Sequence, residues 1–378
     1  MSSKKRSSNY YTILAIILLV SIGLGACDGD YRKRAIGSHG ELIVVMDSTK
    51  TDSKTAQAIR DVFGESYPGL PGLQPRFDIR FVDFNSTEKL DQIKRMRNLI
   101  VAAPINSDSN VADWIRAMLP DEIQSRVQQN QNYAFPLGDK WYKNQWVLVL
   151  TAPNDDMLAQ NIRESNQNLV RNLEEREVER WKYEVYDKGE QIALSDSLWN
   201  EYGFKFRVQH DYNWHIDTTD FISFRRVLPN NDRWIWVWWK DNVKNINKVD
   251  DEWINAKRDS LMEIYIRGTR DSSYVTTEYR RDIHHKTLTI NGNFAYETRG
   301  TWRMTNDAMG GPFLNYTIYG EDTQRLFMIE LGQFAPKYKK RRFVRQFEAI
   351  GKTFKIDSTF TPQPNNSGPI SQRNTQKP

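Results

Sequence analysis

The sequence predicts a mixed α+β protein of two domains. In the first half, short apolar runs alternate with amphipathic segments, the order typical of an α/β layer domain. The second half is richer in aromatic residues and in consecutive strand patterns, which favour an antiparallel sheet with helices packed on it. A chain of 378 residues is also longer than most single domains. We therefore expect an α/β domain over residues 40–191 and an aromatic-rich α+β domain over residues 192–356.

In the first domain, short apolar runs indicate strands that are covered on both faces. Strands are expected at residues 42–46, 77–84, 99–103 and 146–150. Helices are expected at 55–63, from a capping box of Asn85 and Glu88 to Met96, at 110–118, and as one long polar helix at 155–181. The segment PGLPGLQP at 68–75 cannot be helical, because proline and glycine interrupt it.

In the second domain, strands are expected at residues 204–208, 221–227, 234–239, 274–279, 287–290, 295–304, 313–319 and 326–331, and helices at 251–266 and 341–350. This order is similar to the Mog1/PsbP fold. Residues 357–378 are polar, contain prolines and have few large apolar side chains, so they are predicted to be a disordered tail.

The N-terminus has the pattern of a secretory signal. Lys4, Lys5 and Arg6 precede an apolar stretch at residues 13–24, which is short for a permanent membrane helix. The stretch ends in LGAC, which resembles the lipobox of bacterial lipoproteins and places Cys27, the only cysteine, at the lipidated position. We expect a signal peptide at 1–26 and a lipidated linker at 27–39. An uncleaved signal anchor with an incidental cysteine is the alternative.

The charge of the chain does not favour nucleic-acid binding. Removal of residues 1–26 lowers the net charge from +5 to +2, and no extended basic stripe remains. One dense basic cluster precedes and enters the last predicted helix, and it consists of Lys337, Lys339, Lys340, Arg341, Arg342 and Arg345. We interpret it as a solvated helix face, with contact to anionic lipid head groups as the alternative.

Several strings resemble one uncharacterised family of Bacteroidota lipoproteins, domain-of-unknown-function family 4837. They are GSHGELIVVMD at 37–47, AIRDVFG at 58–64, PGLP at 68–71, RNLIV at 97–101, DAMGGPF at 307–313 and KKRRFVRQFEAI at 339–350. The resemblance implies a place in the cell envelope and no assigned activity, so it supplies no site residues.

The chain lacks the motifs of the common catalytic sites: no GxSxG, Walker loop, GxGxxG or HExxH occurs. His284 and His285 are adjacent, so on a strand they would point to opposite faces and could not share a metal. His39 is expected to be a solvated linker residue. A loop expected between two strands contains four possible zinc ligands, His210, Asp211, His215 and Asp217. Nothing else in the sequence completes a zinc site with them. We therefore predict no catalytic residue, no metal and no cofactor.

The string WIWVWW at 234–239 is the most unusual one in the chain. On a strand, Trp234, Trp236 and Trp238 share one face. They either form an aromatic platform for sugar rings or peptide side chains, or fill the core of a covered sheet, which we favour. Gly310 and Gly311 similarly form either a loop that approaches a ligand or a turn leading into a strand, which we also favour.

These observations lead to two hypotheses of function. The first is a non-enzymatic binding or scaffold protein, anchored to a membrane by lipid on Cys27 in the cell envelope, at the periplasmic face or the cell surface. Its partner would be an envelope protein or glycan and not nucleic acid. The alternative is an envelope glycan- or peptide-directed hydrolase or transferase whose site is assembled from distant residues.

Overall fold

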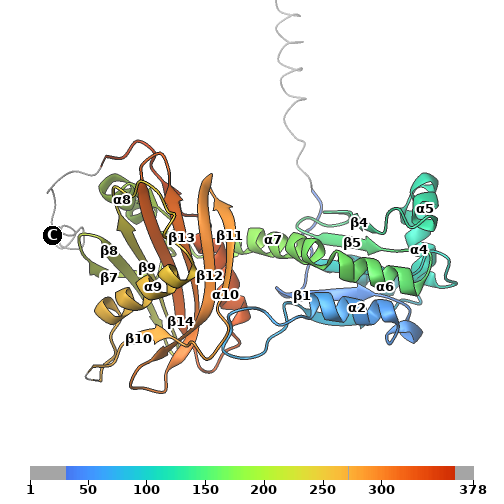
Figure 1. Cartoon of the computed structure of the whole chain (residues 1–378). Coiled ribbons are helices and arrows are strands. Elements are labelled where there is room, and N and C mark those ends of the chain that lie inside the picture. The colour runs from blue at the N-terminus through green and yellow to red at the C-terminus, as the bar shows by residue number, and fades with distance from the viewer. Residues whose placement is uncertain (1–30, 271, 362–378) are drawn as a thin grey trace, which may run out of the picture.

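The computed structural model describes residues 31–270 and 272–361 (Figure 1). The expected signal peptide, Cys27 and most of the expected tail lie outside the described residues. Among the residues described, no helix combines the length and the apolar character needed to cross a membrane.

The first domain is an α/β layer structure, as the sequence predicts. Its sheet contains the parallel strands β1 (Glu41–Val45), β2 (Asp78–Val82), β3 (Asn98–Ala102) and β5 (Trp146–Leu150), with β4 (Ala134–Pro136) antiparallel at one edge, in the order β2-β1-β3-β5-β4. One face packs against α2 (Lys54–Phe63) and α6 (Asp155–Glu164). The other face packs against α3 (Thr87–Lys94), α4 (Asn110–Met118) and α5 (Asp121–Gln128). Strands β1, β3 and β5 are almost entirely buried, which explains their uninterrupted apolar sequences.

Helix α5 and strand β4 have no counterpart among the elements predicted for the first domain, and two predicted helices differ in detail. The long helix expected at 155–181 is two helices, α6 and α7 (Asn166–Glu184), which meet at Ser165. Serine and asparagine compete for backbone hydrogen bonds, and the Asn166 side chain accepts one from the N–H of Gln167. The cap of α3 is Ser86 and not Asn85, because the Ser86 hydroxyl accepts the N–H of Lys89.

The second domain has an antiparallel sheet in the order β10-β12-β13-β14-β9-β8-β7, with β11 also paired to β12. The strands are β7 (Asn213–Asp217), β8 (Phe221–Leu228), β9 (Asn231–Lys240), β10 (Val275–Thr277), β11 (His284–Ile290), β12 (Asn293–Met304), β13 (Gly310–Gly320) and β14 (Arg325–Phe334). Helix α9 (Asp251–Tyr265) covers one face. Helices α8 (Ile192–Tyr202) and α10 (Arg341–Gly351) lie on the other. The α+β class predicted from the sequence is therefore confirmed.

Three elements of the second domain are not those expected. Helix α8 and strand β7 have no counterpart among the predicted elements. The strand expected at 204–208 is only β6 (Phe204–Lys205), which pairs with β15 (Lys355–Ile356) in a separate two-stranded ribbon.

Helix α7 connects the two domains and belongs to both cores. Figure 1 shows it running from the first domain into the second. Leu169 and Leu173 at its N-terminal end pack in the core of the first domain. Val178 and Trp181, two turns further on, pack in the core of the second domain. A single helix therefore fixes how the two domains are placed.

Candidate functional site

The tryptophans of β9 are buried and do not form an exposed platform. Trp234, Trp236 and Trp238 are 8%, 0% and 4% exposed and pack with residues of α9. Ile235 and Val237, on the opposite face of β9, pack in the other core. The alternation expected from the sequence is correct, and the two faces of β9 are both covered, so these tryptophans stabilise the sheet.

Gly310 and Gly311 lie in strand β13, opposite Arg303 and Trp302 of β12. A Cβ atom on Gly311 would lie 2.0 Å from the carbonyl oxygen of Gln333. The absence of a side chain at Gly311 therefore allows two backbone segments of the protein to approach each other; the space is not open to a ligand.

The histidines do not converge on a metal site. His210 and Asp211 lie in the loop before β7, but His215 and Asp217 lie in β7 itself, contrary to the loop expected. The carboxylates are already engaged, since the Arg226 guanidinium donates to Asp211 and the Tyr202 hydroxyl donates to Asp217 at 2.8 Å. Across the described parts of the chain, no group of three histidine, cysteine or carboxylate residues could hold a metal ion.

The adjacent histidines of β11 behave as expected of a strand. His284 is exposed, whereas His285 is partly buried and lies 3.0 Å from the Thr298 hydroxyl. They therefore belong to different environments.

His39 is not a solvated linker residue. Its ring stacks on Trp181 at 4.0 Å, and its Nδ1 lies 3.2 Å from a carboxylate oxygen of Glu177 in α7. Glu177 is fully buried and also accepts hydrogen bonds from Arg180 and Asn98. The segment before β1 is thus held at the junction of the two domains.

A buried ionic network centred on Glu177 joins the domains. Arg345 of α10 lies 3.5 Å from the Glu177 carboxylate, and both side chains are almost completely buried. Burial opposes ionisation of Glu177, but the His39 hydrogen bond and the Arg345 and Arg180 guanidinium groups outweigh it and hold the pKa of this carboxyl well below its usual range. The network has a structural role, because it connects side chains of both domains, although Nε and Nη1 of Arg345 are buried without a hydrogen-bond partner.

The basic cluster at 337–345 is accordingly not one solvated helix face. Lys337 and Lys339 are exposed. Arg341, however, pairs with Asp78 of β2, and Arg345 is buried at the junction of the domains. Part of the cluster therefore holds the second domain against the first.

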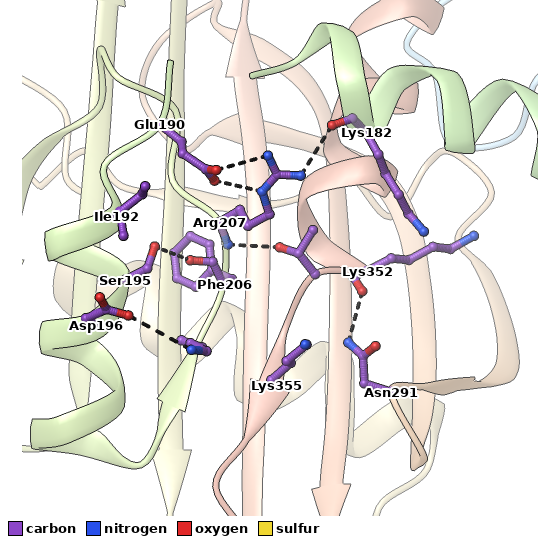
Figure 2. A pocket seen from close by; sticks show the side chains of 12 residues that line it. Lys182, Glu190, Ile192, Ser195, Asp196, Phe206, Arg207, Asn291, Lys352 and Lys355 are labelled. Carbon is purple, nitrogen blue, oxygen red and sulfur yellow. Dashed lines mark hydrogen bonds and ion pairs between the residues drawn. The ribbon is translucent and has the colours of Figure 1, made fainter. Parts of the chain in front are cut away.

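A cavity rich in lysine side chains lies beside α8 (Figure 2). This basic pocket has a volume of about 450 Å³ and is lined by Lys182, Glu190, Ile192, Ser195, Asp196, Lys205, Phe206, Arg207, Asn291, Lys352, Thr353 and Lys355. The volume lies within the range of small-molecule sites. Its lining comes from the end of α7, the start of α8, the β6–β15 ribbon and the turn between β11 and β12.

The framework of the basic pocket is held by internal hydrogen bonds. The Ser195 hydroxyl donates to the Phe206 carbonyl at 2.8 Å, and the Arg207 N–H donates to the Thr353 hydroxyl at 2.9 Å. The Asn291 amide donates to the Lys352 carbonyl at 3.1 Å (Figure 2). These polar groups of the walls are therefore occupied, whereas the lysine side chains remain available for binding.

Two cations of the basic pocket have close carboxylates. Lys182 pairs with Glu179 at 2.6 Å. Arg207 forms a bidentate ion pair with Glu190, with hydrogen bonds of 2.7 and 3.1 Å, and the hydrogen bonding raises the pKa of Arg207. Lys205 reaches Asp196 only at 4.0 Å. Within the described residues, Lys352 and Lys355 form no ion pair. The pocket thus presents ammonium groups that lack a close carboxylate.

A second cavity, of about 510 Å³, lies at the carboxyl ends of β1, β3 and β5 in the first domain. Strand β2 lies on one side of β1 and strand β3 on the other, so the strand order changes direction at β1. Open α/β sheets bind ligands at such a switch point. The nearby helix N-termini are already capped by the protein, however. Ser53 caps α2, Ser109 caps α4 and Asn154 caps α6. The cavity therefore offers fewer free groups than the basic pocket.

The sequence offered little to locate the basic pocket. Its lining comes from segments as far apart as residues 182 and 355, and no local string has the spacing of a known site. The one usable signal was the pair Lys352 and Lys355, two lysines just after the last predicted helix.

Comparison with known proteins identifies the chain as a protein of two uncharacterised domains. Residues 191–353 match the family described as Domain of unknown function (DUF4837), and residues 35–186 match Domain of unknown function (DUF8532). The C-terminal domain therefore matches the model of family 4837, the family the sequence resemblance indicated, and this match contains the DAMGGPF and KKRRFVRQFEAI strings. The strings before residue 102 lie in the other match. No curated protein matches the chain.

Three solved structures resemble parts of the chain. A Bacteroides thetaiotaomicron protein is 8% identical with a TM-score of 0.25, and the alignment covers 41% of this chain and 45% of that one. The Mog1 E65A mutant is 9% identical with a TM-score of 0.28 (42% and 92% covered). The Saccharomyces cerevisiae Ran-binding protein Mog1p is 9% identical with a TM-score of 0.27 (41% and 90% covered). The chain thus spans less than half of the first of these proteins, and such low scores say nothing about function.

Proposed function

We propose that the protein is a non-catalytic binding protein of the cell envelope, anchored to a membrane through lipid on Cys27, and that it binds an anionic envelope component at the basic pocket. One observation carries the binding role: a cavity of ligand size in which Lys352 and Lys355 form no ion pair with the described residues and Lys205 reaches Asp196 only at 4.0 Å. Groups of like charge around a concave site attract ligands of opposite charge and raise their local concentration.

The anchor is supported by the N-terminal pattern and by the start of the folded chain. The four residue-to-residue steps from Cys27 to Tyr31 span at most about 14 Å, so the first domain would remain close to the membrane surface. Arg32, Lys33 and Arg34 follow and are exposed. Basic residues next to a membrane add attraction to anionic lipids.

Labelling with a fatty-acid analogue tests the anchor. Cells grown with the analogue should label the wild-type protein and not the Cys27→Ala variant, and the variant should leave the membrane fraction. An unlabelled wild-type protein, or a variant that stays with membranes to the same extent, would refute the anchor.

Photo-crosslinking in intact cells tests the binding role. Ile192 lines the basic pocket and is 64% exposed, so a photoreactive residue can replace it. Ile264 of α9 is a matched control, because it is 58% exposed and its helix covers the opposite face of the sheet. We expect one discrete adduct from position 192 and none from 264. The same adducts from both positions, or none from 192, would count against the proposal.

A further inference from the structure

We propose that the basic pocket binds a phosphomonoester group, carried by a sugar or by a lipid head group. This inference rests on the proposed function, because it names the chemical class of the ligand at the same site. It is carried by the charge balance of the pocket, by the register of two lysines, and by the uncapped start of α8.

The charge balance favours a ligand with more than one negative charge. The lining contains five cations, Lys182, Lys205, Arg207, Lys352 and Lys355, and two carboxylates, Glu190 and Asp196. Because Glu179, outside the lining, neutralises Lys182 at 2.6 Å, the remaining net charge is +2. A carboxylate ligand would bring a single negative charge. A phosphomonoester carries about −1.5 to −2 at neutral pH and three acceptor oxygens, so several ammonium groups can bind it together.

Lys205 and Lys355 are directly opposite each other in the β6–β15 ribbon. Like charges in this position destabilise a strand pair. The nearest carboxylate of Lys205 is Asp196 at 4.0 Å, and among the described residues no carboxylate lies within 4.0 Å of the Lys355 ammonium. Both lysines line the same cavity, so one anion between them would remove their repulsion. The ribbon thus places two lysines side by side in the wall of the cavity, where a bound phosphate would contact both.

The start of α8 adds donors to the same wall. Ile192 and Ser195, in the first turn of this eleven-residue helix, line the pocket, and no side chain caps the N-terminus. The first N–H groups of a helix have no acceptor within the helix, and its dipole favours an anion there. Because the Ser195 and Thr353 hydroxyls are used internally, the pocket should recognise the phosphate and discriminate little between the groups that carry it.

Calorimetric titration of the full chain in detergent with glucose 6-phosphate tests the proposal. Glucuronate is the matched ligand, because it carries a carboxylate on a similar ring. We expect glucose 6-phosphate to bind at pH 7.5 and glucuronate to bind at least about tenfold more weakly. Binding should weaken at pH 5, because the second pKa of a phosphomonoester is near 6. No binding of glucose 6-phosphate, or equal binding of glucuronate, would overturn the proposal.

The double variant Lys205→Gln with Lys355→Gln separates a binding role from a structural one. It should weaken glucose 6-phosphate binding by about 5- to 30-fold. It should also melt at the same or a higher temperature than the wild type, because the repulsive pair is gone. The control Lys337→Gln with Lys339→Gln removes the same charge from exposed positions outside the pocket. The same loss of affinity in the control, or unchanged affinity in the pocket variant, would contradict the proposal.

Vesicle flotation distinguishes the two sources of phosphate. Full chains with Cys27→Ala are mixed with vesicles that contain phosphatidic acid, a lipid phosphomonoester. If the protein floats with the vesicles and this depends on Lys205 and Lys355, the phosphate belongs to a lipid. If the protein binds glucose 6-phosphate but does not float with the vesicles, the phosphate belongs to a sugar. If neither probe binds while position 192 still gives its crosslinked adduct, the phosphate assignment fails and the proposed function stands.

Discussion

Replacing Glu177 by glutamine should destabilise the protein far more than the same change two residues further along the helix. Glu177 is 0% exposed and faces the guanidinium groups of Arg180 at 2.7 Å and Arg345 at 3.5 Å, which are themselves 1% and 3% exposed. Glutamine keeps one acceptor oxygen, replaces the other by an NH2 group that cannot accept a hydrogen bond, and removes the charge. Because both arginines would remain buried without a counter-charge, we expect a loss of about 3–5 kcal/mol in the free energy of unfolding.

Glu179→Gln is the matched control on the same helix. Glu179 is about half exposed and pairs with Lys182 at 2.6 Å. Exposed pairs contribute about 0.2–1 kcal/mol, so this variant should resemble the wild type in urea unfolding. Since Gly40 and Asn98 of the first domain and Arg345 of the second all contact Glu177, the Glu177 variant should also be cut faster between the domains by protease. A loss below about 1 kcal/mol would refute the idea that this network holds the domains together.

Three further predictions concern stability. Gly311→Ala should cost about 1–3 kcal/mol in urea unfolding, because its Cβ would lie 2.0 Å from the Gln333 carbonyl oxygen; a neutral result would show that the strands can separate there. Trp236→Ala should cost about 3–5 kcal/mol and leave glucose 6-phosphate binding unchanged, because Trp236 is fully buried in the core beneath α9; lost binding without lost stability would restore a ligand role for this strand. Burial opposes ionisation of Glu297, but Arg299 and Lys286 outweigh it and lower its pKa to about 2. Ionised Glu297 therefore stabilises the fold above pH 4.5, and this contribution is lost as the pH falls from about 4.5 to 2. The Glu297→Gln variant should lose less stability over this pH range than the wild type does.

The fold could be predicted from the sequence because its signals are local. The continuous apolar runs of β1, β3 and β5 and the alternating pattern of β9 follow from burial on both faces of a sheet. The elements that were missed lack such a signal. Helix α8 buries only Leu198 in its eleven residues, and β7 is partly exposed throughout, so neither has a clear apolar period.

The candidate site could not be predicted, because it depends on contacts between distant segments. Lys205 and Lys355 face each other only because β15 returns to pair with β6, and nothing near either residue predicts that register. The conspicuous WIWVWW string, by contrast, is accounted for by the core. Buried charges were also invisible in the sequence: Arg345 looks like its exposed basic neighbours but is 3% exposed and faces Glu177.

The proposed binding role requires that the cations of the basic pocket hold the ligand in the cell. The direct measurement is the yield of the adduct from a photoreactive residue at position 192, in intact cells, with and without the changes Lys205→Gln and Lys355→Gln. We predict that the adduct forms in the otherwise wild-type chain, is strongly reduced in the pocket variant, and is unchanged with Lys337→Gln and Lys339→Gln. An adduct of equal yield in all three proteins would contradict the account.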